Sequence, residues 1–320
     1  MACGTVDAEL DYLQRLPLYQ QEKPFQLFVP IHERDQDARS TNLEFEKRTQ
    51  TFVDIRDQVN DFSLDSHGFQ VETSPSRLNA QSFGDQSLIK NEYLPEVENL
   101  LKLVGNSNDR VFIFDWRLRD AGAPREREDN ELDMNDLATW LRPSPTVHVD
   151  QSASGVLHRV LLHLPDDAPF LLQGRVRLIN VWRPIGNSVQ DYPLACCDSA
   201  SVLDEDLIEC DHVRRKFKGS NLYAHHRDGQ RWYYLSEQRP DEVLLIKMFD
   251  SDPSGAHMPR FVTLWHRQKQ SLDGASKSEP WYSVRSTIQT SRQPLLREID
   301  GEFRAGLCRT HGDSYSITTL

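Results

Sequence analysis

The chain has 320 residues, enough for one large domain or two modest ones, and it carries 49 acidic against 37 basic side chains. The resulting net charge of −12 repels phosphate backbones and anionic lipid headgroups, so we expect neither nucleic acid nor a membrane surface as a partner. No apolar run approaches the ~20 residues needed to cross a bilayer, and Met1–Asp7 has neither a basic flank nor an apolar stretch. We therefore expect a cytoplasmic protein that binds small molecules, with a homodimer left open.

The five cysteines agree with a reducing compartment, because their number is odd. Cys196 and Cys197 are adjacent and poorly placed to bridge each other. Cys3, Cys210 and Cys308 have no CxxC spacing. A zinc site built on thiolates is therefore not expected.

The first predicted elements are a strand, a helix and a second strand. Residues 51–57 alternate apolar and polar side chains, as a half-buried strand does. In residues 93–104, Leu94, Val97, Leu101 and Val104 share one helix face, with a proline in the first turn and a glycine after the end. Residues 111–114 are typical of a buried strand.

The second half of the chain is predicted to be rich in strands. Residues 117–144 form a charged, proline-containing excursion on the surface, and whether it covers a pocket is left open. A helix is predicted over 202–210, with Ser201 as its N-cap. Short β-type segments separated by turns favour a sandwich or jelly roll. These segments are 146–149, 175–182, 231–235, 242–249, 260–265 and 282–288.

We expect a single domain over residues 1–320, because no period of 20–50 residues repeats. Its expected parts are N-terminal strands and a helix packed on the core (1–118), the charged excursion (119–145), the jelly-roll core (146–290) and a C-terminal tail (291–320).

The sharpest local signal for chemistry is His148-Val149-Asp150. Residues i and i+2 of a strand point to the same face, so an imidazole nitrogen and a carboxylate oxygen can meet at one ion. Two of the three ligands of a two-histidine, one-carboxylate iron(II) site would then be present. The competing interpretation is a chance pair, because the chain has 11 histidines.

Several segments, taken in order along the chain, carry a resemblance to one family. The segments are 62–70, 93–97, 147–152, 180–185, 192–198, 231–234 and 241–251. They resemble the fungal and bacterial family that contains the gibberellin desaturase, an aspergillic-acid hydroxylase/desaturase and a cephem-methoxylase subunit. The resemblance implies a mainly β fold with flanking helices, the double-stranded β-helix (jelly roll) of iron(II)/2-oxoglutarate oxygenases.

The chain departs from this family at two positions that matter for oxidation. Oxidising members carry Arg-Phe-x-Pro-His, which supplies the distal iron ligand, whereas residues 260–264 put Leu264 at the histidine position. His266, two residues on, is the candidate substitute. The arginine by which the family binds the distal carboxylate of 2-oxoglutarate is replaced by Glu279, whose charge would repel that carboxylate. Of that motif, Arg285 remains.

The two losses lead to three hypotheses. The first is a redox-neutral cyclase without cofactor, because the chain resembles fungal hetero-Diels–Alderases of tropolone-sesquiterpenoid pathways. That resemblance implies apolar substrates, a tropolone quinone methide formed by dehydration and a humulene-type alkene. The alternative is an oxygenase with Fe(II) and 2-oxoglutarate as cofactors, in which His148, Asp150 and His266 bind the metal. The third is a silent ligand-binding subunit.

A cycloaddition needs a shaped space with aromatic walls and a hydrogen-bond or proton donor. The candidate catalytic donors lie in or beside strands that the family directs at its cavity: His158, Arg183, Tyr234, Lys247 and Arg285. The candidate substrate-binding aromatics, of which we expect at least half to fill the core, are Trp182, Trp232, Phe249, Trp265, Trp281 and Tyr282.

Two of the donors carry a structural expectation of their own. Arg183 shares a strand face with Val181, so both side chains face the cavity or neither does. Lys247 lies in the apolar run 244–249, where an unpaired ammonium is costly. We therefore expect it to pair with Asp198 or Asp250, or with a ligand, and a purely structural ion pair is left open.

Overall fold

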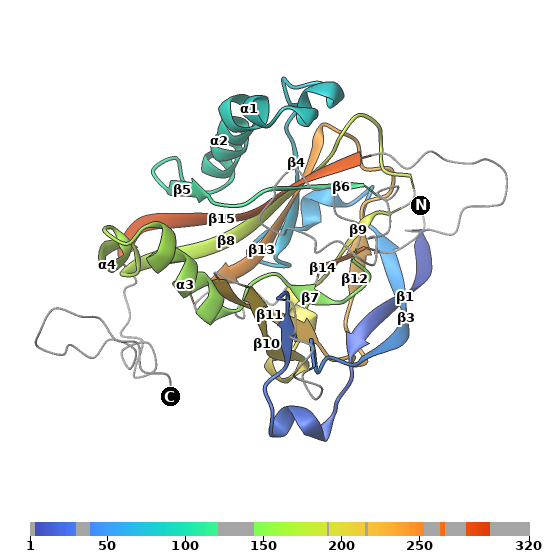
Figure 1. Ribbon diagram of the computed structural model, residues 1–320. Helices are drawn as coiled ribbons and strands as arrows, with labels where there is room; N and C mark the ends of the chain where they lie inside the picture. Colours follow the sequence, from blue (N-terminus) through green and yellow to red (C-terminus); the bar gives the residue numbers. More distant parts are fainter. Residues whose placement is uncertain are drawn as a thin grey trace, which may run out of the picture.

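The computed structural model describes residues 4–29, 39–120, 144–190, 192–214, 217–252, 263–265 and 280–294; for residues 120, 263–265 and 280–294 it describes the backbone. Two β-sheets pack against each other, and helices lie on the outer side of one sheet and at one end of the pair (Figure 1). Within the described residues, no helix combines the length and apolar character needed to cross a bilayer.

The larger sheet places the histidine of the His-x-Asp motif near its middle. Its strands are β1 (Thr5–Leu13), β2 (Phe25–Leu27), β3 (Phe45–Asp54), β7 (His148–Val149), β9 (Leu194–Cys197), β10 (Leu207–Arg214), β11 (Phe217–Ala224), β12 (Trp232–Tyr234) and β14 (Thr263–Trp265). The order across the sheet is β1-β3-β12-β9-β14-β7-β11-β10-β2. Strand β7 therefore lies between β14 and β11, which both pair with it antiparallel.

The smaller sheet is built around one long buried strand. Its strands are β4 (Phe69–Thr73), β5 (Arg110–Ile113), β6 (Arg117–Asp120), β8 (Gly174–Pro184), β13 (Glu242–Asp250) and β15 (Pro280–Pro294). The order is β4-β13-β8-β15-β5, and β6 also pairs with β15. Strand β8 therefore has β13 on one side and β15 on the other, with both of its faces covered by protein.

Alternation along β8 divides its side chains between two cores. Leu178 and Trp182 belong to the main core between the two sheets, which also contains Phe52 and Trp232 from the larger sheet. Ile179 and Val181 point the other way and join a second core with helix α2 (Leu94–Val104). Each face of this strand therefore meets a different partner, and this explains why it is buried from Val176 to Pro184.

The helices cover two places. Helix α1 (Gln86–Leu88), the π-helical turn Ile89–Tyr93 and α2 lie over the outer face of the smaller sheet (Figure 1). Helices α3 (Ala153–His163) and α4 (Ala168–Leu171) lie at one end of the sheets, and α3 contacts β11. Short 3₁₀ turns occur at Pro17–Gln20, Val59–Asp61, Ala80–Gly84, Ser199–Ser201 and Asp204–Asp206.

The mainly β fold with flanking helices is confirmed, as are the helix over residues 93–104 and strands at most predicted positions. The helix predicted over 202–210 is wrong: two 3₁₀ turns precede β10, and Ser201 caps no α-helix. From Leu207 onward, side chains alternate in a strand that pairs with β11, and this tertiary pairing overrides the local acidic signal.

Two further predictions need correction at the chain's middle. The charged excursion was expected from Arg117, but Arg117 and Arg119 are buried in strand β6. Residues 121–143, the rest of that excursion, lie outside the described residues. Helix α3 was missed; Ser152 caps it by accepting a hydrogen bond from the Gly155 amide.

Candidate active site

His148 and Asp150 face each other where β7 leaves the larger sheet. His148 Nε2 lies 3.3 Å from Asp150 Oδ1, and the two side chains are only 12% and 10% exposed. His148 Nδ1 lies 2.7 Å from the carbonyl oxygen of Thr146, to which it donates. Asn180 of β8 reaches across from the smaller sheet and donates from Nδ2 to Asp150 Oδ2 at 2.6 Å. His148 Nδ1 and Asp150 Oδ2 are thus fixed by hydrogen bonds to the surrounding protein, and His148 Nε2 and Asp150 Oδ1 face each other.

The charges of this pair stabilise each other. Burial alone would lower the pKa of His148, but the hydrogen bond and charge of Asp150 outweigh burial and raise this pKa above its ordinary value. Burial would raise the pKa of Asp150, yet His148 and then Asn180 hold this pKa below its usual range. The contact between His148 Nε2 and Asp150 Oδ1 therefore favours the charged form of both side chains.

A second histidine lies close by on β10. Tyr223 of β11 is the register partner of His148, and its hydroxyl lies 3.3 Å from His212 Nε2. Burial, together with the charges of Arg214 and His148, lowers the pKa of His212 to about 4. His212 is therefore neutral at physiological pH, next to a pair that is charged.

The strand expected to supply a third metal ligand lies beside His148. Thr263 of β14 is the register partner of His148, and Leu264 is the register partner of Ala195. Within the described residues, no group of three histidine, cysteine, aspartate or glutamate side chains lies close enough to hold a metal ion. His266 and Glu279 lie outside them. His148 and Asp150 thus fit two corners of an iron site, and the described residues offer no third.

Lys247 lies in a network of charges away from this pair. Its Nζ donates to Asp250 Oδ2 at 2.9 Å and to Asp65 Oδ1 at 3.0 Å. Arg175 binds the same two carboxylates. Asp198, the other expected partner, binds Arg231 instead. These contacts are the ones expected if Lys247 forms a structural ion pair with Asp250.

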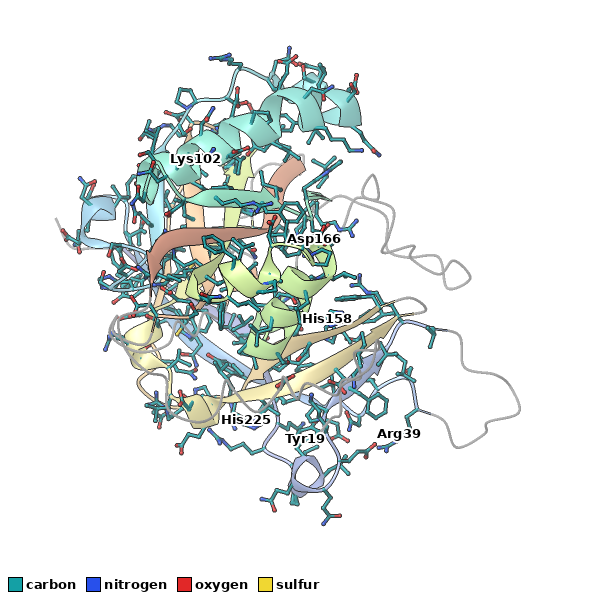
Figure 2. The ribbon with its side chains drawn as sticks, turned by 90° about the vertical axis from the view of Figure 1, so that its left-hand side faces the viewer. Tyr19, Arg39, Lys102, His158, Asp166 and His225 are labelled. Carbon is teal, nitrogen blue, oxygen red and sulfur yellow. The ribbon has the colours of Figure 1, made fainter. Side chains whose placement is uncertain are left out.

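Arg183 and His158 do not reach the space between the sheets. Arg183 faces the helical layer with Val181: its Nε donates to the hydroxyl of Tyr93 at 3.1 Å, and its Nη1 donates to the carbonyl of Pro240 at 2.6 Å. There it lines a separate cavity of about 160 Å³. His158 is exposed on α3, with its ring 5.4 Å from that of Phe217 (Figure 2). The roles of Arg183 and His158 as donors stay predictions.

The remaining predicted residues divide into core residues and residues known by backbone alone. Trp182, Trp232, Tyr234 and Phe249 are buried in the main core, where the Trp232 indole donates to the Tyr12 hydroxyl. This agrees with the expectation that many of the aromatics fill the core. The backbone but not the side chain is described for Trp265, Trp281, Tyr282 and Arg285.

Sequence reasoning missed the residues that surround the pair. Asn180 was noted only as sharing a face with Trp182, and nothing local indicates that it meets Asp150 from another sheet. His212 and Arg214 follow the segment wrongly predicted as a helix and lie in the same strand as its end, since Ile208, Cys210 and His212 alternate as a strand does. The alternation of side chains in 207–214 indicated a strand, but the acidic residues Asp204, Glu205 and Asp206 before it were interpreted as the start of a helix.

Two packed sheets, with His148 and Asp150 facing each other at the end of β7, agree with the jelly-roll fold that the resemblance implies. A family model described as "Oxidoreductase/YMDC permease-like domain" matches residues 10–271. The chain belongs to this family, together with fungal iron(II)/2-oxoglutarate-dependent dioxygenases and hydroxylase/desaturases.

Two relatives show the relationship in sequence. The Fe(II)/2-oxoglutarate-dependent dioxygenase nvfI of Aspergillus novofumigatus is 31% identical over 215 residues, which cover 64% of this chain and 73% of the relative. The hydroxylase/desaturase CTB9 of Cercospora beticola is 33% identical over 224 residues, covering 66% and 68%.

A solved structure shows the relationship in fold. The iron and alpha-ketoglutarate-dependent endoperoxidase NvfI superposes with a TM-score of 0.72 at 24% identity, covering 89% of this chain and 97% of that one. At this identity the likeness concerns the fold alone. It agrees with the jelly roll that the sequence predicted.

Proposed function

We propose that this chain is an iron(II)- and 2-oxoglutarate-dependent oxygenase that hydroxylates or desaturates a small secondary metabolite. The observation that carries the proposal is the orientation of His148 and Asp150. A histidine that binds a metal ordinarily donates its other ring N–H to a carbonyl or carboxylate, and its partner carboxylate is itself hydrogen-bonded. Thr146 and Asn180 provide these two outer contacts.

In this proposal the metal would be held by His148 Nε2 and Asp150 Oδ1, the two atoms that converge. Bound there, iron would supply the oxygen chemistry that side chains cannot perform. Asn180 fixes the Asp150 carboxylate so that only one oxygen faces the site. The Thr146 carbonyl fixes the imidazole tautomer so that the Nε2 lone pair faces the same point. For His148 Nε2 to bind a metal, the proton between Nε2 and Asp150 Oδ1 would have to be released.

The third corner of the site needs a donor that Leu264 does not have. His266 is the nearest histidine in the sequence beyond β14, and water is the other source of an oxygen ligand. The names of the relatives, dioxygenase and hydroxylase/desaturase, support the oxygenase proposal over the cyclase.

A redox-neutral cyclase, the hetero-Diels–Alderase of the sequence hypothesis, is the second candidate. Two specific observations favour it: Leu264 at the third-ligand position and Glu279 at the carboxylate-binding position. It would require a donor other than Lys247 or Arg183, because carboxylates surround the first and the helical layer surrounds the second. His148, with its raised pKa, is the proton donor that lies between the sheets.

Metal content tests the first proposal. The purified chain is stripped with a chelator and reloaded with ferrous iron without oxygen; we expect about one equivalent of iron in the wild type, and loss of most of it in His148→Ala and Asp150→Asn. His226→Ala, which removes a partly exposed histidine against Tyr12, is the matched control and should retain the iron. Iron that binds equally to all four proteins, or to none, would refute a His148/Asp150 site and promote the second candidate.

A further inference from the structure

Two arginines lie beside the candidate active site, and among the residues that the structure describes no carboxylate forms a salt bridge with either. Arg159 of α3 has its guanidinium between two aromatic rings, 4.0 Å from the centre of Phe217 and 5.0 Å from that of Phe114. Its Nε is buried and has no hydrogen-bond partner. Arg214, at the end of β10, lies over the ring of Phe28 at 5.4 Å. Within the described residues, neither guanidinium forms a salt bridge.

The surroundings of these arginines are positive in an otherwise acidic chain. Arg117 of β6 is a third cation nearby. Among the described residues, the carboxylate whose charge acts on both Arg159 and Arg214 is that of Asp115, and its Oδ1 lies 3.6 Å from Arg117 Nε. Burial, and then the balance of these neighbouring charges, lowers the pKa of Arg159 and of Arg214. A partly buried cation that has no partner costs folding free energy, so Arg159 and Arg214, which form no salt bridge within the described part of the chain, indicate an anion that binds there.

The cluster is continuous with the His148/Asp150 pair. Arg214 and His212 are two residues apart on β10, so they share a face of the sheet. His212 contacts the Tyr223 hydroxyl, and the Tyr223 ring lies 6.4 Å from that of His148. Helix α3, which carries Arg159, covers this end of the two sheets: Val156 and Val160 pack into the main core, while His158 faces outward (Figure 2).

We propose that Arg159 and Arg214 bind the carboxylate of a ligand whose other end reaches His148 and Asp150. The part of this proposal that brings the ligand's other end to His148 and Asp150 rests on the proposed function. The contact of the carboxylate with Arg159 and Arg214 does not depend on it. A guanidinium presents parallel N–H donors that match a carboxylate, and stacking on Phe217 and Phe114 preorganises the fork. The same rings provide an apolar surface for the ligand's body, so the expected ligand is a carboxylic acid with an apolar or short aliphatic chain.

The carboxylate has two sources, the co-substrate 2-oxoglutarate or the metabolite itself. If it is the co-substrate, these arginines replace the arginine that Glu279 displaced. If it is the metabolite, they determine substrate specificity. Both sources require the same contact, and two different probes distinguish them.

The experiment uses the full chain, stripped of metal, and isothermal titration calorimetry, so that no enzymatic activity is needed. The probes are 2-oxoglutarate, 4-phenylbutyrate and methyl 4-phenylbutyrate, which lacks the charge. We expect at least one carboxylate to bind and the ester not to bind. Arg159→Gln and Arg214→Gln should each weaken carboxylate binding about 10–100-fold, because a charged hydrogen bond contributes that much to an affinity.

Lys90→Gln removes one positive charge from the helical layer, on the far side of the smaller sheet, and is the matched control. It should change the affinity less than about twofold, since exposed charges at that distance are screened. Without ligand, Arg214→Gln should unfold at the wild-type temperature or above it, because the substitution removes a like charge. Binding of 2-oxoglutarate assigns the carboxylate to the co-substrate, and binding of 4-phenylbutyrate alone assigns it to the metabolite.

Two results would overturn the proposal: neither carboxylate binds better than the ester, or both arginine variants bind as the wild type does. Neither result depends on iron. Failure here therefore leaves the metal test of the oxygenase proposal intact, and failure of the metal test leaves the carboxylate site intact.

Discussion

His212 is held neutral by its surroundings, and this has a consequence for stability. Its pKa is lowered to about 4 in the folded protein, against an ordinary value of about 6.5 in the unfolded chain. Below pH 6.5 the unfolded chain therefore binds a proton that the folded protein does not bind until pH falls to about 4. The free energy of unfolding should fall over this window, by about 2 kcal/mol at pH 5 relative to pH 7.5.

Urea unfolding of the wild type and His212→Gln at pH 7.5 and pH 5 measures this effect. The other titrating groups contribute equally to both proteins and cancel in the comparison. The free energy of unfolding of the variant should therefore fall by about 2 kcal/mol less than that of the wild type between pH 7.5 and pH 5. Equal losses in both proteins would show that His212 does not titrate abnormally.

At the residue scale, what the sequence predicts depends on how far apart the interacting residues are. His148 and Asp150 follow from the two-residue period of a strand, and the structure brings them within 3.3 Å. Asn180 is 30 residues from Asp150 and in another sheet, so no local pattern predicts the contact. The charge of Arg214 acts on Arg159 because α3 lies against β11, the neighbour of β10.

Helix α3 is positioned by the close approach of Gly155 to strand β11. A Cβ at this position would lie 2.9 Å from the backbone oxygen of Ser220 and 2.9 Å from Gln151 Oε1. Alanine is a better helix former than glycine by about 1 kcal/mol, yet the backbone oxygen cannot give way. Gly155→Ala should therefore lower the unfolding temperature and, by displacing Arg159, weaken carboxylate binding.

Gly84→Ala is the control for this substitution, because a Cβ at Gly84 would meet nothing within 4 Å. Thermal unfolding and calorimetry should show the Gly84 variant unchanged in both properties. A Gly155 variant more stable than the wild type would show that helix propensity outweighs the contact, and that α3 is not fixed by it.

At the element scale, the helix with a strong period, α2, was predicted, whereas strand β10, which depends on its partner strand, was not. Val97 and Leu101 are buried as their spacing predicts, because one face of α2 covers the smaller sheet. Strand β10 was mistaken for a helix because Asp204, Glu205 and Asp206 resemble a helix start; Asp206 is instead buried between Arg15 and Arg227. These ion pairs join Asp206 to residues far from it in the sequence, so the residues adjacent to Asp206 do not reveal them.

At the scale of the whole molecule, positive charge is concentrated in one place although the net charge is negative. A net charge of −12 predicts repulsion of anions at long range, whereas the end of the sandwich near α3 concentrates arginines beside the candidate active site. The acidic surface and the basic site together favour a small carboxylate over a polyanion. The class of ligand therefore follows from the fold, because the topology determines which charges meet.

The most direct test of the central claim is release of succinate from 2-oxoglutarate by the iron-loaded chain. Even without its metabolite, an oxygenase of this class should form succinate slowly, and only with both iron and air. Asp150→Asn should reduce the rate by about 100-fold or more, since it removes a charged ligand. A wild type that forms no succinate under air, yet converts a candidate metabolite in argon without iron, would contradict the oxygenase account and establish the cyclase.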